Sequence, residues 1–523
     1  MLFFLILLVI VLINVILASR GALKGSPKEL WFLYAAKVVE YSAYGGANLA
    51  FVLFLSADVG LSDQQAGSYI GVWSMLVTIA TILVGAVCDA IGIKRTLILG
   101  TLLLLFARVF MPLSDSLLWV TLLSFVPIAL GTAIVGPVLS VGIKRFTTSE
   151  GAALGFGLFY TLMNVGWAAG GLIFDGIRTA LGEHAMVAIP LLGGEMSTYQ
   201  VIFTASLVLT IPTLLLVLFM REGVERMDDG SIVVTPAAPR AEGTMWHATA
   251  VVMKKAAADT GRIFGKAVSE RAFWVFIFLL AIPVPVRMVF FHFHYTFPKY
   301  GIRVLGDGVK IGNIYSVLNP VLIVLLVPVI AALTKKVSSY RMMSIGTAVS
   351  AGAVFLAALP PSLYEPLMGT WLADLVFNTW LGVPVGQQTP LFFVMIVYVM
   401  VFTVGEAIWS PRLLQFTAEI APAGREGSYI ALSYLPFFAA KLVVGPLSGW
   451  LLTTYTPERT FILKLADEPL RVMGAVSPYA DHGMIWLIVG GMALVSPIAF
   501  VAFAKVFHMA ERKELYGKVE TPA

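Results

Sequence analysis

The chain has 523 residues, of which 59% are hydrophobic and only 12% are charged. Charged residues make up about a quarter of an ordinary soluble domain, so most of this surface must face lipid rather than water. The single cysteine, Cys88, excludes an intrachain disulfide framework and a multi-cysteine metal site, while the meaning of the net charge of +5 depends on where the basic residues lie.

Apolar runs of about 20 residues are long enough to cross a bilayer as helices. Residues 1–18 form one such stretch, and because no basic residue precedes it we expect an extra N-terminal membrane helix rather than a signal peptide. Further runs lie near 30–56, 66–88, 96–112, 117–141, 152–177, 200–220, 272–297, 311–334, 342–360, 389–416, 428–454 and 483–507. We predict an all-α polytopic membrane protein in which 29–220 and 272–507 form two six-helix bundles.

The longest polar interval, residues 221–271, separates the two predicted bundles. Its first part, 222–243, contains Asp228-Asp229-Gly230 and is typical of a flexible linker. Residues 244–268 alternate apolar and basic positions, which fits either an amphipathic helix at the membrane surface or a solvated linker helix. Lys and Arg concentrate in the loops and tails that lie on the same side of the membrane as this interval. By the positive-inside rule this predicts that the interval and the tail 508–523 are cytoplasmic. The basic charge then sets the membrane topology, and we expect no binding of nucleic acid.

A charged loop joins the second and third predicted helices, where residues 85–95 read GAVCDAIGIKR. Gly92 permits a tight turn, and the charges of Asp89, Lys94 and Arg95 are able to form a latch that breaks and re-forms. The spacing of Gly85, Asp89, Gly92, Lys94 and Arg95 resembles the signature loop of the major facilitator superfamily, although an ordinary basic loop is the alternative. The resemblance implies two similar helix bundles around a central substrate site.

Three later stretches resemble the proton-dependent oligopeptide transporter family of that superfamily. They are Phe159-Tyr160 with Asn164 and Gly166, Asn319-Pro320 with Pro328, and Gly405-Glu406 with Ser410-Pro411 and Ala421-Pro422. The resemblance implies that Glu406 and Asn319 meet a substrate amine, with Asn164 and Tyr160 as further binding candidates. The first helix departs from the family pattern, because the chain aligned on Tyr44-Gly45 lacks its paired carboxylates and both arginines, and Gly136 stands where a lysine is expected.

Few charges lie inside the predicted spans, and each should face a bundle interior because a charge among lipid tails costs about 3 kcal/mol. Lys37, Arg287 and Lys441 are positive, while Glu40 and Glu406 are negative. This excess of positive charge favours a substrate that carries a carboxylate. Arg287 is able to bind that carboxylate as a fork or to form a permanent salt bridge with Glu406, and Lys441 is a second candidate cation.

Two carboxylates are candidates for proton coupling, since a carboxylate kept away from water holds a proton more readily. Glu406 is the first, with a structural ion pair as the alternative. Glu40 is the second, but Lys37 lies three residues earlier on the same helix face and is able to neutralise it. Tyr41 and Tyr44 complete the substrate-binding candidates as part of an aromatic wall.

The remaining motifs narrow the function. His292 and His294 point in different directions on a helix, so we expect no metal site there. No P-loop is present to bind ATP, and no residue pattern of an intramembrane enzyme is evident. Pro283 and Pro285, and the pairs Gly45-Gly46 and Gly170-Gly171, are expected to bend helices for a gate.

We therefore predict a secondary transporter of a cell membrane that works by alternating access and is not an enzyme. Its partners are a small-molecule substrate, protons and the lipid bilayer, with no cofactor and no nucleic acid, and we expect a monomer with a cytoplasmic C-terminus. Proton-coupled uptake of a peptide-like or carboxylate-bearing solute is the first interpretation. Export, or transport of organic anions or drug-like molecules, is the alternative.

Overall fold

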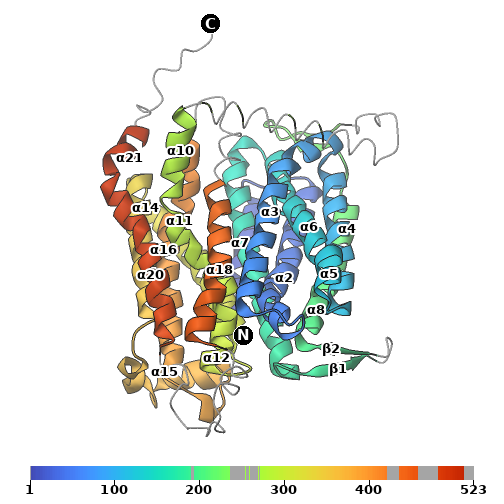
Figure 1. The fold of residues 1–523 in the computed structure, drawn as a ribbon. Coiled ribbons are helices and arrows are strands. Elements are labelled where there is room, and N and C mark those ends of the chain that lie inside the picture. Colours follow the sequence, from blue (N-terminus) through green and yellow to red (C-terminus); the bar gives the residue numbers. More distant parts are fainter. Residues whose placement is uncertain are drawn as a thin grey trace. The chain divides into compact units, whose positions relative to one another are not determined.

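The computed structural model describes residues 2–189, 194–235, 271–420, 435–457 and 481–511, with single positions at 254, 258, 265 and 269. The described chain is dominated by helices (Figure 1). By length and composition, 8 of these helices suffice to cross a membrane, or up to 10 if each of two bent helix pairs counts as one span. Every apolar run predicted after residue 29 overlaps a helix, which confirms the all-α polytopic fold.

The chain divides into two compact units. Unit 1 comprises Met1–Gly60 and Trp73–Phe264, and unit 2 comprises Leu61–Val72 and Gly265–Ala523. The first turns of the second predicted span therefore belong with the C-terminal half, which the apolar pattern alone did not indicate. The predicted helix at 244–268 and the tail beyond residue 511 lie outside the described residues, apart from the single positions given above.

Unit 1 is built from long helices and two short antiparallel hairpins. Its helices are α1 (Leu2–Arg20), α2 (Lys28–Ala57), most of α3 (Asp63–Ile91), α4 (Ile93–Phe110), α5 (Leu117–Val120), α6 (Val126–Phe146), α7 (Ser149–Leu181) and α8 (Thr198–Leu218), with a 3-10 turn at Met111–Leu113 and a π-helical stretch at Thr121–Phe125 between α5 and α6. Strands β1 (Met186–Ile189) and β2 (Gly194–Ser197) pair beyond one end of the helices (Figure 1). Ser197 then starts α8 through a capping box with Gln200, as the Ser-x-x-Gln spacing favours.

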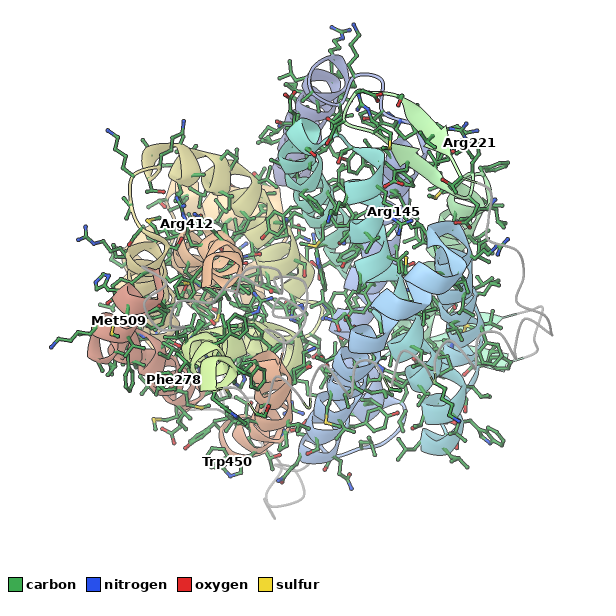
Figure 2. All side chains as sticks on the ribbon, turned by 90° about the horizontal axis from the view of Figure 1, so that it is seen from above. Arg145, Arg221, Phe278, Arg412, Trp450 and Met509 are labelled. Carbon is green, nitrogen blue, oxygen red and sulfur yellow. The ribbon has the colours of Figure 1, made fainter. Side chains whose placement is uncertain are left out.

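The second hairpin, β3 (Val224–Arg226) and β4 (Ile232–Val234), lies where a flexible linker was expected. Polar contacts hold this hairpin and the two residues before it against the helices of unit 1. Arg221 forms an ion pair with the buried Glu29 (Nε to Oε1, 2.7 Å), and Figure 2 shows this arginine beside the hairpin. Arg226 donates to Ser26 Oγ at 2.6 Å, Asp228 accepts from Ser149 N at 2.7 Å, and Glu222 accepts from Arg95 N at 3.2 Å.

The consequence is that the start of the predicted linker is an ordered part of unit 1, joined to the first turns of α2, α4 and α7. The two hydrogen bonds from Ser149 N and Oγ to the exposed carboxylate of Asp228 also lower its pKa. An anion held at the amino terminus of α7 interacts favourably with the helix dipole. The expectation of flexibility for residues 222–243 is therefore wrong for residues 222–234, where the structure describes a docked hairpin.

Unit 2 contains shorter and more often broken helices. They are α10 (Arg271–Ala281), α11 (Val284–Tyr295), α12 (Phe297–Leu305), α13 (Leu318–Leu333), α14 (Ser339–Leu356), α15 (Trp371–Asp374), α16 (Leu391–Ile420), α18 (Leu435–Tyr455), α20 (Gly483–Ala502) and α21 (Ala504–Glu511). Short 3-10 or π-helical stretches cover Gly312–Val317, Pro361–Leu367, Leu375–Leu381 and Val385–Gln387.

A bend between two helices of unit 2 lies at the prolines where the sequence predicts it. Helices α10 and α11 meet at an angle of 52° around Pro283. Pro285 follows in the first turn of α11, and the next amide, Val286 N, donates to Ser496 Oγ of α20 at 3.1 Å instead of to its own helix. A side chain from a neighbouring helix thus satisfies a donor that the break sets free.

Glycines allow close helix crossings rather than bends. In unit 1, α2 and α7 are continuous helices that pack where Gly46 meets Gly170, and a Cβ on Gly170 would stand 2.7 Å from Gly46 N. In unit 2, the first turns of α3 cross α18, where Gly67 and Gly71 face Gly445. The expectation that the pairs Gly45-Gly46 and Gly170-Gly171 bend helices is therefore wrong, because they bring backbones together.

The crossing of α2 and α7 generates a prediction about stability. Replacing Gly170 by Ala places a methyl group against the backbone of α2, so the variant should lose about 1–3 kcal/mol of stability, and its apparent Tm in detergent should fall. Gly157→Ala is the matched control on the same helix, since nothing lies within 4 Å of its Cβ position. Equal Tm values for the two variants would contradict the assigned crossing.

Candidate functional site

The centre of unit 2 holds a carboxylate bound by an amide. Glu406 lies on α16 and Asn319 at the start of α13, and the side chains are 6% and 7% exposed. Asn319 Nδ2 donates to Glu406 Oε2 at 2.7 Å and also contacts Thr403 Oγ1 at 2.9 Å. The two residues that sequence resemblance paired are therefore in direct contact.

Aromatic rings surround this pair. Phe290 of α11 packs edge-on against Phe402 and Trp409 of α16, with ring centroids 5.1 and 6.4 Å apart. The indole Nε1 of Trp409 donates to Ser350 Oγ at 3.2 Å, so this ring is held in one orientation. An apolar wall beside Glu406 keeps the local dielectric low, which strengthens any electrostatic interaction there.

Two cations lie on partly exposed side chains of α11 and α18. The Arg287 guanidinium stands 4.7 Å from the centroid of the Phe290 ring, and Lys441 Nζ stands 5.6 Å from that of Phe291. The charge of Arg287 acts on both Glu406 and Lys441. Among the described residues Arg287 and Glu406 form no salt bridge.

In unit 1 the carboxylate of Glu40 has a partner that sequence reasoning missed. Arg108 of α4 binds it with two hydrogen bonds, Nη1 to Oε2 at 3.0 Å and Nη2 to Oε1 at 2.7 Å, and also contacts Thr210 of α8. Both charged side chains are buried. An arginine inside an apolar helix was the available signal, because such a residue needs a carboxylate within reach.

Among the described residues Lys37 forms no salt bridge with Glu40, the alternative that the sequence left open, although the charge of Glu40 still acts on it. Its ammonium lies 3.6 Å from the ring centroid of Tyr41 and 4.1 Å from that of Phe159, in a buried position. The three-residue spacing puts Lys37 and Glu40 on one face, but Arg108 offers Glu40 two parallel hydrogen bonds that an ammonium cannot match. The rings stabilise the lysine charge through a cation–π contact.

The other aromatic candidates of unit 1 gather around one tryptophan. Tyr41 and Tyr44 of α2 contact Trp167 of α7 with ring centroids 6.2 and 5.5 Å apart. Asn164 Nδ2 donates to the backbone oxygen of Tyr160, one turn earlier on the same helix, at 2.9 Å. Tyr41, Tyr44 and Tyr160 are partly exposed, whereas Asn164 is buried.

The predicted latch loop contains the expected turn. Gly92 has φ +87°, a backbone conformation that side chains disfavour, and it separates α3 from α4. The carboxylate of Glu222 lies against this turn and accepts from Arg95 N, so an acidic group from beyond α8 occupies the amino terminus of α4. The side chain of Asp89 and the surroundings of Gly85 lie outside what the structure describes. The latch role of these two residues and of Lys94 stays a prediction.

The histidines and Arg412 have structural partners. His292 Nδ1 is 2.7 Å from Thr296 Oγ1, and His294 Nδ1 is 2.9 Å from its own helix at Phe290 O. In the part of the chain that the structure describes, no three His, Cys, Asp or Glu side chains are grouped to hold a metal ion. Arg412, labelled in Figure 2, donates to Thr334 Oγ1 at 3.1 Å and so joins α16 to the end of α13.

Helices of this length, with buried charged groups in both units, are typical of a polytopic membrane protein. The family model described as Major Facilitator Superfamily matches residues 33–391. The chain belongs to the major facilitator superfamily. Members of this superfamily are transporters and not enzymes, so the predicted class of protein is confirmed.

Sequence relatives are similar over part of the chain. A di-/tripeptide transporter of Lactococcus lactis subsp. cremoris is 26% identical over 181 residues, which are 32% of this chain and 36% of the relative. A di-/tripeptide transporter of Lactococcus lactis subsp. lactis strain IL1403 is 25% identical over the same length. The match thus spans about a third of these relatives, since it covers 36% of each.

Solved structures are similar over nearly the whole chain. A peptide transporter POT in complex with sulfate has a TM-score of 0.64 at 16% identity, over 92% of this chain and 96% of that one. A POT family transporter with a thioalcohol-conjugated peptide has a TM-score of 0.63 at 15% identity, over 93% and 100%. The tetrameric PepTSo2 has a TM-score of 0.63 at 16% identity, over 92% and 98%. These likenesses confirm the fold. Together with the family model and the peptide-transporter relatives, they support the resemblance to the oligopeptide transporter family.

The ion pair of unit 1 generates a second prediction. Arg108→Met should destabilise the protein by about 3–5 kcal/mol, because it leaves Glu40 buried without a counter-charge. The double variant Glu40→Gln/Arg108→Met removes both charges and should be more stable than Arg108→Met alone. Thermal unfolding in detergent measures both. Losses that simply add in the double variant would show that the two side chains do not act as a pair.

Proposed function

We propose that the chain is a proton-coupled secondary transporter that takes up a small peptide-like or carboxylate-bearing solute by alternating access. The observation that carries the proposal is the cluster of Arg287, Lys441 and the Asn319-bound Glu406 in unit 2. The names of the Lactococcus relatives support a di- or tripeptide as the substrate class. A multi-pass position in the cell membrane with a cytoplasmic C-terminus belongs to the same proposal.

The cluster offers complementary groups to the two ends of a zwitterion. Arg287 and Lys441 repel each other across a region of low dielectric, and a substrate carboxylate between them would relieve that repulsion. Glu406 has one oxygen bonded to Asn319, which leaves the other for a substrate ammonium. The apolar surround of Phe290, Phe402 and Trp409 suits the rest of a small solute.

Glu406 is a better proton carrier than Glu40. Both oxygens of Glu40 bind Arg108, so protonating Glu40 would leave a buried guanidinium without its counter-charge. Glu406 binds the neutral amide of Asn319, so protonating Glu406 leaves no buried charge without a counter-charge there. We therefore assign proton coupling to Glu406 and a structural role to Glu40.

Two further features stay within the proposal. Tyr41, Tyr44, Tyr160 and Asn164 contribute substrate contacts from unit 1, supported by the partial exposure of the three tyrosines. A monomer is the expected working state, although one similar structure, PepTSo2, is tetrameric.

The coupling role is tested by uptake of a labelled dipeptide into proteoliposomes. With an inward pH gradient the wild-type protein should accumulate the dipeptide, and Glu406→Gln should still exchange it but lose uphill accumulation, because the amide cannot carry a proton. Glu365→Gln, a change at an exposed carboxylate of unit 2, is the control and should behave as wild type. Uphill accumulation by Glu406→Gln would remove this glutamate as the carrier.

The carboxylate role of the cations is tested with the same dipeptide and its C-terminal amide. Arg287→Gln and Lys441→Gln should each raise KM for the dipeptide about 10–100-fold, the expected effect of losing a charged hydrogen bond of about 1.5–3 kcal/mol. The amide, a poor substrate from the start, should respond little. Arg412→Gln is the control, since Arg412 bonds Thr334 and Gln415 instead. An unchanged KM in both cluster variants would refute the assignment.

A further inference from the structure

A fully buried chain of hydrogen bonds links α11 to α18 in unit 2. His292 Nδ1 lies 2.7 Å from Thr296 Oγ1, and Thr296 Oγ1 donates to Ser448 Oγ at 2.8 Å. The three residues are 1%, 0% and 1% exposed. His292 belongs to α11, Thr296 ends that helix, and Ser448 belongs to α18.

One ring nitrogen of His292 is held and the other is not. With the Thr296 hydroxyl donating to Ser448, its oxygen accepts from His292 in the tautomer that carries a proton on Nδ1. Among the described residues, the buried Nε2 has no hydrogen-bond partner. A buried polar atom without a partner is destabilising, so an apolar residue would serve simple packing better than histidine does.

The linked helices are the two that carry the cations of the proposed substrate site. Arg287 lies on α11, five residues before His292, and Lys441 lies on α18, two turns before Ser448. Lys441 stands over the ring of Phe291, the neighbour of His292. The hydrogen bonds of His292, Thr296 and Ser448 join the two helices without placing a carboxylate beside the cations.

The start of α11 is anchored separately. Val286 N, next to Arg287, donates to Ser496 of α20, whereas the relay of His292, Thr296 and Ser448 holds the end of α11 against α18. The relay thus joins the helix of Arg287 to the helix of Lys441 by side-chain hydrogen bonds.

We propose that His292 is a positioning residue that, through Thr296 and Ser448, sets the separation of Arg287 and Lys441 and thereby tunes the transporter for a substrate carboxylate. The inference rests on the proposed function, since it presumes that the two cations bind that group. His292 itself does not touch the substrate. Loss of its hydrogen bond should therefore weaken selection of the carboxylate without abolishing transport.

The test compares His292→Leu with His292→Asn in proteoliposomes, using a dipeptide and its C-terminal amide. Leu keeps the bulk but removes the donor, and KM for the dipeptide should rise about tenfold while KM for the amide stays the same. Asn places an amide N–H near the position of Nδ1–H and should restore KM to within about threefold of wild type. Ser448→Ala should mimic Leu, and the double variant His292→Leu/Ser448→Ala should be no worse than either single change.

The outcomes separate this inference from the proposed function. If the wild-type protein transports the amide as well as the dipeptide, carboxylate recognition itself fails. If the wild type discriminates but His292→Leu raises KM for both substrates equally, or for neither, then His292 is a packing residue and the positioning role is overturned. Size-exclusion profiles in detergent confirm that each variant is folded before KM is compared.

Discussion

The cost of placing charge among membrane helices is the constraint on which this structure depends. A charged side chain there needs an opposite charge or strong hydrogen bonds, because water is not available to solvate it. The requirement is met for Glu40 and Arg108 in unit 1, since Arg108 binds both oxygens of Glu40. In unit 2 the charge of Arg287 acts on Glu406 and on Lys441, but among the described residues Arg287 and Glu406 form no salt bridge. The closed pair is suited to holding helices together, and the open cluster is suited to receiving a ligand.

Close packing of helix backbones at glycines is the second interaction that holds the helices of each unit together. Glycines bring α2 to α7 in unit 1 and the first turns of α3 to α18 in unit 2. At the beginning of α3, Asp63 binds Lys299 and Arg303 of α12 at 2.7 Å each, so the glycine crossing ends in a buried ion cluster. Because α18 also carries Lys441, the packing of α3 against α18 helps to position one helix of the candidate site.

The sequence predicted the features that depend on local pattern. Apolar runs located the helices, Gly92 located a turn, and Pro283 located a bend, since each follows from the residue itself. The partner of Glu40 was not predictable in this way, because Arg108 comes from a helix whose contact with α2 is set by tertiary packing. The hairpin at 224–234 was missed although Asp229-Gly230 shortly before the β-branched run 232–234 is a turn signal, because the surrounding polarity favoured a linker.

On the proposed role of Glu406, the charge of the unit 2 cluster would link the proton to the substrate. Protonating Glu406 removes a negative charge on which Arg287 acts and so leaves the cluster more positive by one unit. That proton would therefore strengthen binding of a substrate carboxylate, and a bound carboxylate would favour the proton by the same free energy, since linkage is reciprocal. A substrate ammonium has the opposite effect, because it competes with the proton for Glu406. An anionic solute would thus be carried together with the proton, whereas a zwitterion must release its ammonium from Glu406 before the proton can bind there.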